Sequence, residues 1–141
     1  MTAVKVTIKI DMNSEEMRLF EGRKKVGILN YVMDIGKDKI ILTTLEIRKE
    51  FQGKGYGTLL VHALMGVADA LHTPIYAISD VSTIAFYEKL GFICLRKFKN
   101  GEYKEKEVII MNLRTCDFLD EVEKIDLIWI PSKLEKVKIY I

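Results

Sequence analysis

The sequence predicts an α+β fold with a mixed, mainly antiparallel central sheet. Two features of the pattern predict it. Most apolar segments either alternate apolar with polar residues or are rich in β-branched residues, and both patterns are typical of strands. One long segment, 57–72, instead repeats its apolar residues at helical spacing between two strands. Such a strand-helix-strand unit makes its two strands parallel inside an otherwise antiparallel sheet.

Four strands are expected in the first half of the chain. Val4–Ile10 alternates apolar and polar residues, and Met17–Glu21 with Val26–Met33 reads as a hairpin joined by a glycine turn. The β-branched segment Lys39–Ile47 reads as a central strand. The polar residues Asp11–Glu16 separate the first two strands and suffice for one helical turn.

The second half of the chain alternates helices and strands. The helix at 57–72 turns one apolar stripe to the core, which consists of Leu59, Leu60, Ala63, Leu64, Val67 and Leu71. A short apolar strand, Pro74–Ser79, leads to a second helix at 81–90. Phe92–Phe98 and Glu107–Leu113 then alternate as an antiparallel pair.

The last segment, 115–141, is apolar enough to pack against the rest of a folded protein. It reads as a helix near Asp117–Lys124, followed by two strand-like runs, Asp126–Ile130 and Leu134–Ile141. We therefore divide the chain into a domain of residues 1–114 and a C-terminal extension that packs on this domain or on a partner subunit, as a lid or a dimer surface.

The overall composition narrows the functional classes. A chain of 141 residues with a net charge of +2 and a pI near 8.4 is too weakly basic to indicate nucleic acid binding. Cys94 and Cys116 match no metal or redox spacing, so we expect two reduced cysteines and no metal. No apolar run reaches the roughly 18 residues of a membrane span, and no signal-peptide pattern is present. These features predict a cytoplasmic protein without a membrane contact.

A glycine-rich basic turn is the most informative segment. Gly53, Gly55 and Gly57 stand at alternate positions between the predicted central strand and the long helix. Glycines let the backbone approach a ligand closely, and the first N–H groups of the helix point at the turn. Arg48 and Lys54 add positive charge. The turn is therefore predicted to bind a phosphate-bearing ligand.

Two common phosphate-binding motifs do not fit this turn. A P-loop requires Ser or Thr directly after Gly-Lys, but Gly55 follows Lys54. A dinucleotide fingerprint requires a different glycine spacing and an acidic residue about 20 positions later, where the chain has Ala77 to Ser79. The turn instead resembles the acyl-CoA pyrophosphate loop of the GNAT (Gcn5-related) N-acetyltransferases, Gln/Arg-x-x-Gly-x-Gly/Ala. Gln52, Gly55 and Gly57 match it.

A second segment strengthens the resemblance. Ser82 to Phe92 is similar to the family's other signature, a short helix that ends Phe-Tyr-Glu-Lys-x-Gly-Phe, and Gly91 is suited to end that helix. The two motifs have the family's order and separation, and the resemblance extends from Lys39 to Leu113. It implies an acyl-CoA N-acyltransferase fold with helices on both faces of the sheet. Because only Asp11–Glu16 separates the first strands, most of the usual N-terminal helices are lacking.

The resemblance also implies how acetyl-CoA is held. Its pantetheine would lie between two splayed parallel strands, 39–47 and 74–79, and a backbone N–H around Leu45–Ile47 would meet the carbonyl oxygen. The implied cofactor-binding residues are Leu45, Ile47, Gln52, Gly53, Lys54, Gly55, Tyr56, Gly57, Thr58, Asp80 and Tyr87. Asp80 replaces an asparagine of many relatives and could instead cap the helix at 81–90.

Two catalytic residues are candidates. Tyr87 matches the family's tyrosine that protonates the leaving thiolate, although it could simply pack on a helix face. Glu46 is the carboxylate within the central strand and could serve as base, or it could be a surface group that pairs with Lys39 or Arg48. A water relay, or Glu102 or Tyr103 of the late hairpin, could also supply the base.

The leading hypothesis is an N-acetyltransferase that moves the acetyl group of acetyl-CoA to a primary amine in a ternary complex. Its acceptor could be a small molecule or a protein amine. Because the helices that usually cover the acceptor side are lacking, a second subunit could cover it, which makes a homodimer plausible. The alternative is a non-catalytic CoA-binding module that acts as a sensor or assembly subunit. A third hypothesis, nucleotide or RNA binding through the basic turn, conflicts with the modest charge and the lack of stacking motifs.

Overall fold

The computed structural model of the protein describes residues 4–34, 39–79, 81–95, 110–111 and 125–131. The first four strands are β1 (Val6–Asp11), β2 (Glu16–Glu21), β3 (Lys24–Asp34) and β4 (Lys39–Ile47). A short 3₁₀ turn, η2 (Lys49–Phe51), leads to α1 (Tyr56–Leu71) and β5 (Ile75–Ser79). The remaining elements are η3 (Val81–Thr83), α2 (Ile84–Lys89), β6 (Ile93–Leu95), β7 (Ile110–Met111) and β8 (Ile125–Trp129).

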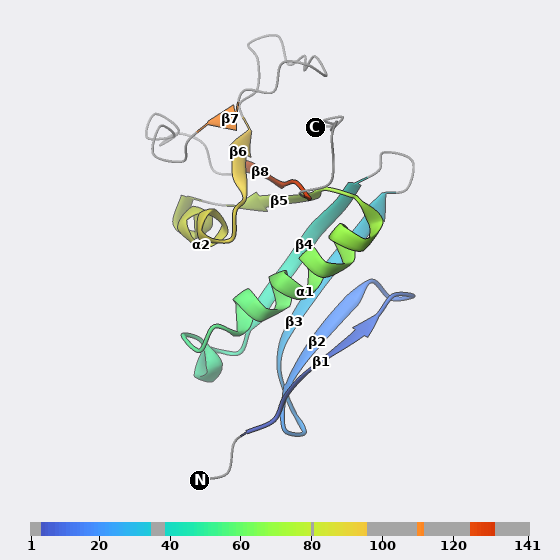
Figure 1. Cartoon of the computed structure of the whole chain (residues 1–141). Helices are drawn as coiled ribbons and strands as arrows, with labels where there is room; N and C mark the ends of the chain where they lie inside the picture. Colours follow the sequence, from blue (N-terminus) through green and yellow to red (C-terminus); the bar gives the residue numbers. More distant parts are fainter. Residues whose placement is uncertain (1–3, 35–38, 80, 96–109, 112–124, 132–141) are drawn as a thin grey trace.

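All eight strands form one sheet in the order β1-β2-β3-β4-β5-β8-β6-β7. Within the described residues only β4 and β5 run parallel, because α1 crosses between them, and the other pairs found there are antiparallel. Figure 1 shows α1 lying along β3 and β4. The predicted α+β fold with a mixed, mainly antiparallel sheet is therefore confirmed.

The core lies between α1 and the sheet. The helix buries six side chains, of which four, Leu60, Val61, Leu64 and Ala68, are fully inaccessible. They pack on buried strand residues such as Leu29 and Ile75. Removing this much apolar surface from water supplies most of the drive to fold. Tyr87, the buried side chain of α2, belongs to the same cluster, so both described helices contribute to one core.

The C-terminal extension contributes a strand to the middle of the sheet. The predicted strand Asp126–Ile130 corresponds to β8, which pairs with β5 on one side and β6 on the other. The predicted pairing of Phe92–Phe98 with Glu107–Leu113 is seen where Cys94 lies opposite Met111. The predicted helix at 117–124 and strand at 134–141 lie outside the described residues, and the division after residue 114 stays a prediction.

A β-bulge at Thr43 breaks the regular alternation of β4. Asn30 lies opposite Thr44 while Tyr31 lies opposite Leu42, so Thr43 is an extra residue. Its hydroxyl donates to the Asn30 carbonyl, 3.1 Å away. Because the bulge adds one residue, Leu42 and Leu45 both turn toward the α1 side of the sheet although three positions separate them.

Close packing between β3, β4 and α1 should make Gly27 intolerant of a side chain. A Cβ there would lie 2.6 Å from Ile47 Cδ1 and 3.3 Å from the Glu46 carbonyl oxygen. We expect Gly27→Ala to lower the free energy of unfolding by about 1–3 kcal/mol. Gly66 in α1 is the matched control, since nothing lies within 4 Å of its Cβ position, and Gly66→Ala should stabilise by about 0.5–1 kcal/mol. Urea unfolding measures both, and equal effects would contradict this account of the packing.

Candidate functional site

The parallel strands β4 and β5 separate partway along their length. Their pairing covers only Ile40 to Leu42 on β4, with Leu42 opposite Ala77, although β4 continues to Ile47 and β5 to Ser79. The separation begins next to the bulge at Thr43, which bends the strand. Among the described residues no strand pairs with this edge of β4 beyond Leu42, and we call the interval between the separated strand ends the slot. An extended ligand chain can pair with such an edge.

The glycine-rich turn lies beyond the end of β4, between η2 and α1. Gly53 and Gly55 have φ values of +83° and +81°, which only glycine adopts at little cost. Gly55 caps α1 without a side-chain hydrogen bond, so the N–H groups of the first helical turn have no side-chain cap. The amide of Gln52 donates to the Ile47 carbonyl at 3.0 Å and ties the turn to the end of β4. The turn has the geometry of an anion site at a helix N-terminus.

Three elements meet at Gly57. A Cβ at this position would lie 3.5 Å from the Phe86 ring of α2 and 3.9 Å from Ile47 of β4. Tyr87, the next residue of α2, is 7% exposed and packs edge-to-face on Phe86 and Phe92, with ring centroids 5.1 and 5.2 Å apart. These are ordinary van der Waals distances, so α2 packs close to the start of α1 and the end of β4, and a Cβ at position 57 would fit there.

Glu21 anchors the turn from the neighbouring hairpin. Its carboxylate accepts a hydrogen bond from the Tyr56 hydroxyl at 2.6 Å and lies 3.5 Å from the Lys54 ammonium. The Tyr56 hydroxyl lowers the pKa of the Glu21 carboxyl, and Lys54 adds to this effect; the same hydrogen bond raises the pKa of Tyr56. Lys54 and Lys24 each lie 5.1 Å from the Phe51 ring centroid. Glu21 of the hairpin therefore anchors the turn, and the ammonium groups of Lys54 and Lys24 keep positive charge beside it.

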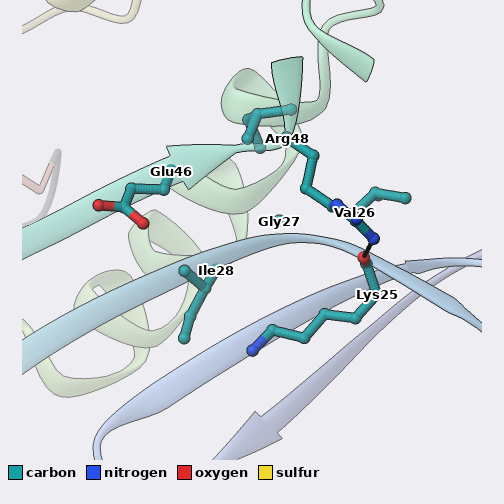
Figure 2. A pocket seen from close by; sticks show the side chains of 7 residues that line it. Lys25, Val26, Gly27, Ile28, Glu46 and Arg48 are labelled. Atoms are coloured by element: carbon teal, nitrogen blue, oxygen red, sulfur yellow. Dashed lines mark hydrogen bonds between the residues drawn. The ribbon is translucent and has the colours of Figure 1, made fainter. Parts of the chain in front are cut away.

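A pocket of about 410 Å³ lies beside β3 and β4. Ile28 lies directly opposite Glu46, and their neighbours Gly27 and Ile47 turn toward α1, so Ile28 and Glu46 face the other side of the sheet. Figure 2 shows the Arg48 side chain crossing to β3, where it donates to a backbone carbonyl at 3.5 Å. The lining consists of Lys25, Val26, Gly27, Ile28, Glu46, Ile47 and Arg48.

The structure brings most of the predicted site residues together. Those at the end of β4, in the turn and in the first turn of α1 are contiguous, and they are Leu45, Ile47, Gln52, Gly53, Lys54, Gly55, Tyr56, Gly57 and Thr58. Tyr87 approaches them through Phe86. Glu46 lies in the pocket on the other face. Asp80, Glu102 and Tyr103 lie outside the described residues.

Sequence reasoning missed two features of this region. The bulge at Thr43 has a signal, because the apolar alternation of Ile40 and Leu42 changes phase before Leu45. The contact between Glu21 and Tyr56 has none, since 35 positions separate them.

Metal and membrane features can be judged for the described residues alone. Within them, no three His, Cys, Asp or Glu side chains are grouped so that they could hold a metal ion. None of the helices found there is long and apolar enough to cross a membrane.

The sequence matches one protein family and one curated protein. The family described as "Acetyltransferase (GNAT) family" matches residues 11–92. A curated protein of Oceanobacillus iheyensis, named an uncharacterized N-acetyltransferase, is 32% identical over 77 residues. The match covers 55% of this chain and 44% of that protein, so the chain matches less than half the length of this relative.

Solved structures match over most of the chain. Ard1 from Thermoplasma volcanium has a TM-score of 0.62 at 14% identity, covering 86% of this chain and 74% of that one. The ribosomal-protein-S18-alanine N-acetyltransferase of Escherichia coli has a TM-score of 0.59 at 16% identity, with coverage of 88% and 74%. Bacillus subtilis YlbP, solved in complex with coenzyme A, has a TM-score of 0.56 at 18% identity, with coverage of 89% and 71%. At these identities the likeness shows the fold alone.

The link between Glu21 and Tyr56 should make stability depend on pH. The pKa of Glu21 is lower in the folded protein than its ordinary value of 4.5. The ionised carboxylate therefore stabilises the folded state above pH 4.5, and this stabilisation is lost as the pH falls through the folded pKa. Tyr56→Phe should therefore lower the melting temperature at neutral pH, and the difference from the parent should shrink below about pH 4. In a Glu21→Gln background the effect of Tyr56→Phe should not vary with acid pH. A pH-independent difference in the parent background would contradict the assignment.

Proposed function

Because this chain belongs to the acetyltransferase (GNAT) family, we propose that it moves the acetyl group of acetyl-CoA to a primary amine by direct attack in a ternary complex. The observation that carries the proposal is the slot between β4 and β5, which ends at the uncapped N-terminus of α1. A pantetheine chain would pair with the free edge of β4, and the pyrophosphate would meet the helix N–H groups.

The reaction requires one bond to form and one to break. The neutral amine nitrogen attacks the thioester carbonyl carbon, the C–S bond breaks, and the proton lost by the amine is balanced by the proton gained by the thiolate. A backbone N–H near Leu45–Ile47 would stabilise the developing oxyanion. Tyr87 would donate to the thiolate, since a phenol with a pKa of roughly 10 is neutral at physiological pH.

We assign the base role to Glu46 as part of the same proposal. It lies next to the backbone segment that would meet the carbonyl oxygen, and its side chain opens into a pocket large enough for a small acceptor. The Glu46 carboxylate is not paired with either cation considered for it, since among the described residues no ion pair joins Glu46 to Lys39 or Arg48. An ammonium beside it could pass its proton to the carboxylate or to a bound water.

A second candidate function is a CoA-binding module without catalysis. The observation that favours it is the tight connection between β1 and β2. Residues 12–15 form turns with no helix, and Glu15 adopts a φ of +54°. The face of the sheet that carries Glu46 is therefore left without a helix from this connection. Turnover over a panel of amines separates the two functions. The cytoplasmic location, the homodimer and the C-terminal extension as lid or dimer surface also stay proposals.

Acetyl-CoA binding is the first test. Calorimetry should detect binding of acetyl-CoA and none of ATP or NAD. Gly55→Asp should weaken acetyl-CoA binding at least about tenfold, because it places a carboxylate at the helix N-terminus that would meet the pyrophosphate. Gly66→Asp adds the same charge to the open face of α1 and should leave the affinity unchanged. Equal effects of both variants, or no binding by the parent, would refute the proposal.

Replacing Tyr87 with Phe tests the proton donor. Phe keeps the ring that packs on Phe86 and Phe92 but removes the hydroxyl. We expect kcat to fall about 10²–10⁴-fold with acetyl-CoA affinity nearly unchanged, because the hydroxyl acts only when the C–S bond breaks. Steady-state kinetics and calorimetry give the two quantities. An unchanged kcat would remove Tyr87 from the mechanism.

A further inference from the structure

We propose that the acceptor is a small amine that also carries an acidic group, a carboxylate or a phosphate, and that Arg48 and Lys25 bind this group while Glu46 receives the amine. The inference rests on the proposed function, since it names the substrate class of the same site. It is carried by the pocket beside β3 and β4, where two cations and one carboxylate surround an apolar floor.

The size and lining of the pocket suit a small molecule. Its volume of about 410 Å³ falls in the range of ligand sites, roughly 300–1,000 Å³. Val26 and Gly27 are buried and Ile28 is half-buried, so the floor between the charged groups is apolar. A few charged groups on an apolar surface fix the orientation of a short ligand.

The Arg48 side chain is directed toward β3 by one long hydrogen bond. Its Nη1 donates to the Lys25 carbonyl at 3.5 Å, and its backbone N–H donates to the Val26 carbonyl at 2.8 Å. Both contacts are made to backbone, so the positive charge of the guanidinium stays uncompensated. Its other N–H groups have no protein partner within the described part of the chain. A planar guanidinium held in this way can receive a carboxylate or a phosphate through two hydrogen bonds.

The opposite charges in the pocket do not neutralise one another. Glu46, Lys25 and Arg48 are all exposed, and among the described residues none of them is in an ion pair. Figure 2 shows the Glu46 carboxylate and the Lys25 ammonium lying clear of the contact made by Arg48. Glu46 and Arg48 are two positions apart along the chain, which places their Cα atoms about 7 Å apart. A ligand with an amine at one end and an acid at the other can therefore pair with both.

Three acidic side chains at the connection between β1 and β2 are already engaged. Asp11 accepts from the Asn13 and Ser14 amides, and Glu15 accepts from the Met33 amide at 2.5 Å. Glu16 pairs with Arg18. These carboxylates stabilise their own loop and strand, so they offer no ready acidic surface for a polycationic amine.

A matched set of two-carbon amines tests the inference by equilibrium binding. Ethanolamine, β-alanine, O-phosphoethanolamine and ethylenediamine share the H₂N–CH₂–CH₂ unit and differ in the group at the other end. Calorimetry on the full chain saturated with CoA, which cannot transfer an acetyl group, should show β-alanine or O-phosphoethanolamine binding at least about tenfold more tightly than ethanolamine. The stronger of the two identifies the acid as carboxylate or phosphate. Ethylenediamine should bind no better than ethanolamine.

Variants locate the effect in the pocket. Arg48→Ala and Lys25→Ala should each lower the ratio of acidic-amine to ethanolamine affinity about tenfold, and Arg48→Lys should retain part of it. Lys89→Ala removes an exposed lysine of α2 outside the pocket and should not change the ratio. CoA affinity is measured first in every variant. If Arg48→Ala weakens only CoA binding and leaves the affinity ratio of the amines unchanged, the assignment of Arg48 is overturned.

Several results would overturn the inference. They are equal affinity for all four amines, a preference for ethylenediamine, binding of acidic peptides without binding of the small acids, or a ratio unaffected by Arg48→Ala and Lys25→Ala. Failure of the proposed function looks different. In that case the acidic amines bind with the expected ratio, but no amine in the panel releases CoA from acetyl-CoA.

Discussion

The separation of β4 from β5 is the constraint on which the rest of the structure depends. A parallel pair normally satisfies its backbone groups along its whole length, because unpaired polar groups are costly away from water. Here the pairing stops after Leu42, next to the bulge at Thr43. The free edge of β4 is then available to a ligand, and α1 begins close to where β4 ends. The extra residue Thr43 thus lies where the slot begins, and the start of α1 lies near its other end.

The glycine-rich turn is held in place by contacts with residues outside it. The turn contributes glycines and backbone amides and few side chains of its own. Its stability comes from outside, through Glu21 on the neighbouring hairpin, Gln52 at the end of β4 and the packing of Phe86 against the start of α1. These contacts order the loop in advance, and a preorganised loop loses less conformational entropy when a ligand binds.

The two faces of the sheet serve different purposes. The α1 side carries the core, and its residues on β3 and β4 are packed so closely that Gly27 has no room for a side chain. The opposite side carries Ile28 and Glu46 beside Arg48 in an open pocket. Strand alternation alone assigns neighbouring residues to opposite faces, so a short stretch of β4 can supply the core with Leu45 and Ile47 and the pocket with Glu46. The pocket and the slot consequently share one strand.

The sequence by itself determined α1, α2 and the first five strands, the glycine-rich turn and the signature around Tyr87, because periodicity, glycine placement and short motifs are local properties of the chain. The limits of α1 and of the first five strands were predictable to within a few residues for this reason. Only the tertiary structure decided that β8 enters the sheet between β5 and β6, that Glu21 anchors Tyr56, and that Lys25 meets Arg48. Strand order and side-chain contacts join residues far apart along the chain, and local patterns state that a strand will pair without stating with which partner.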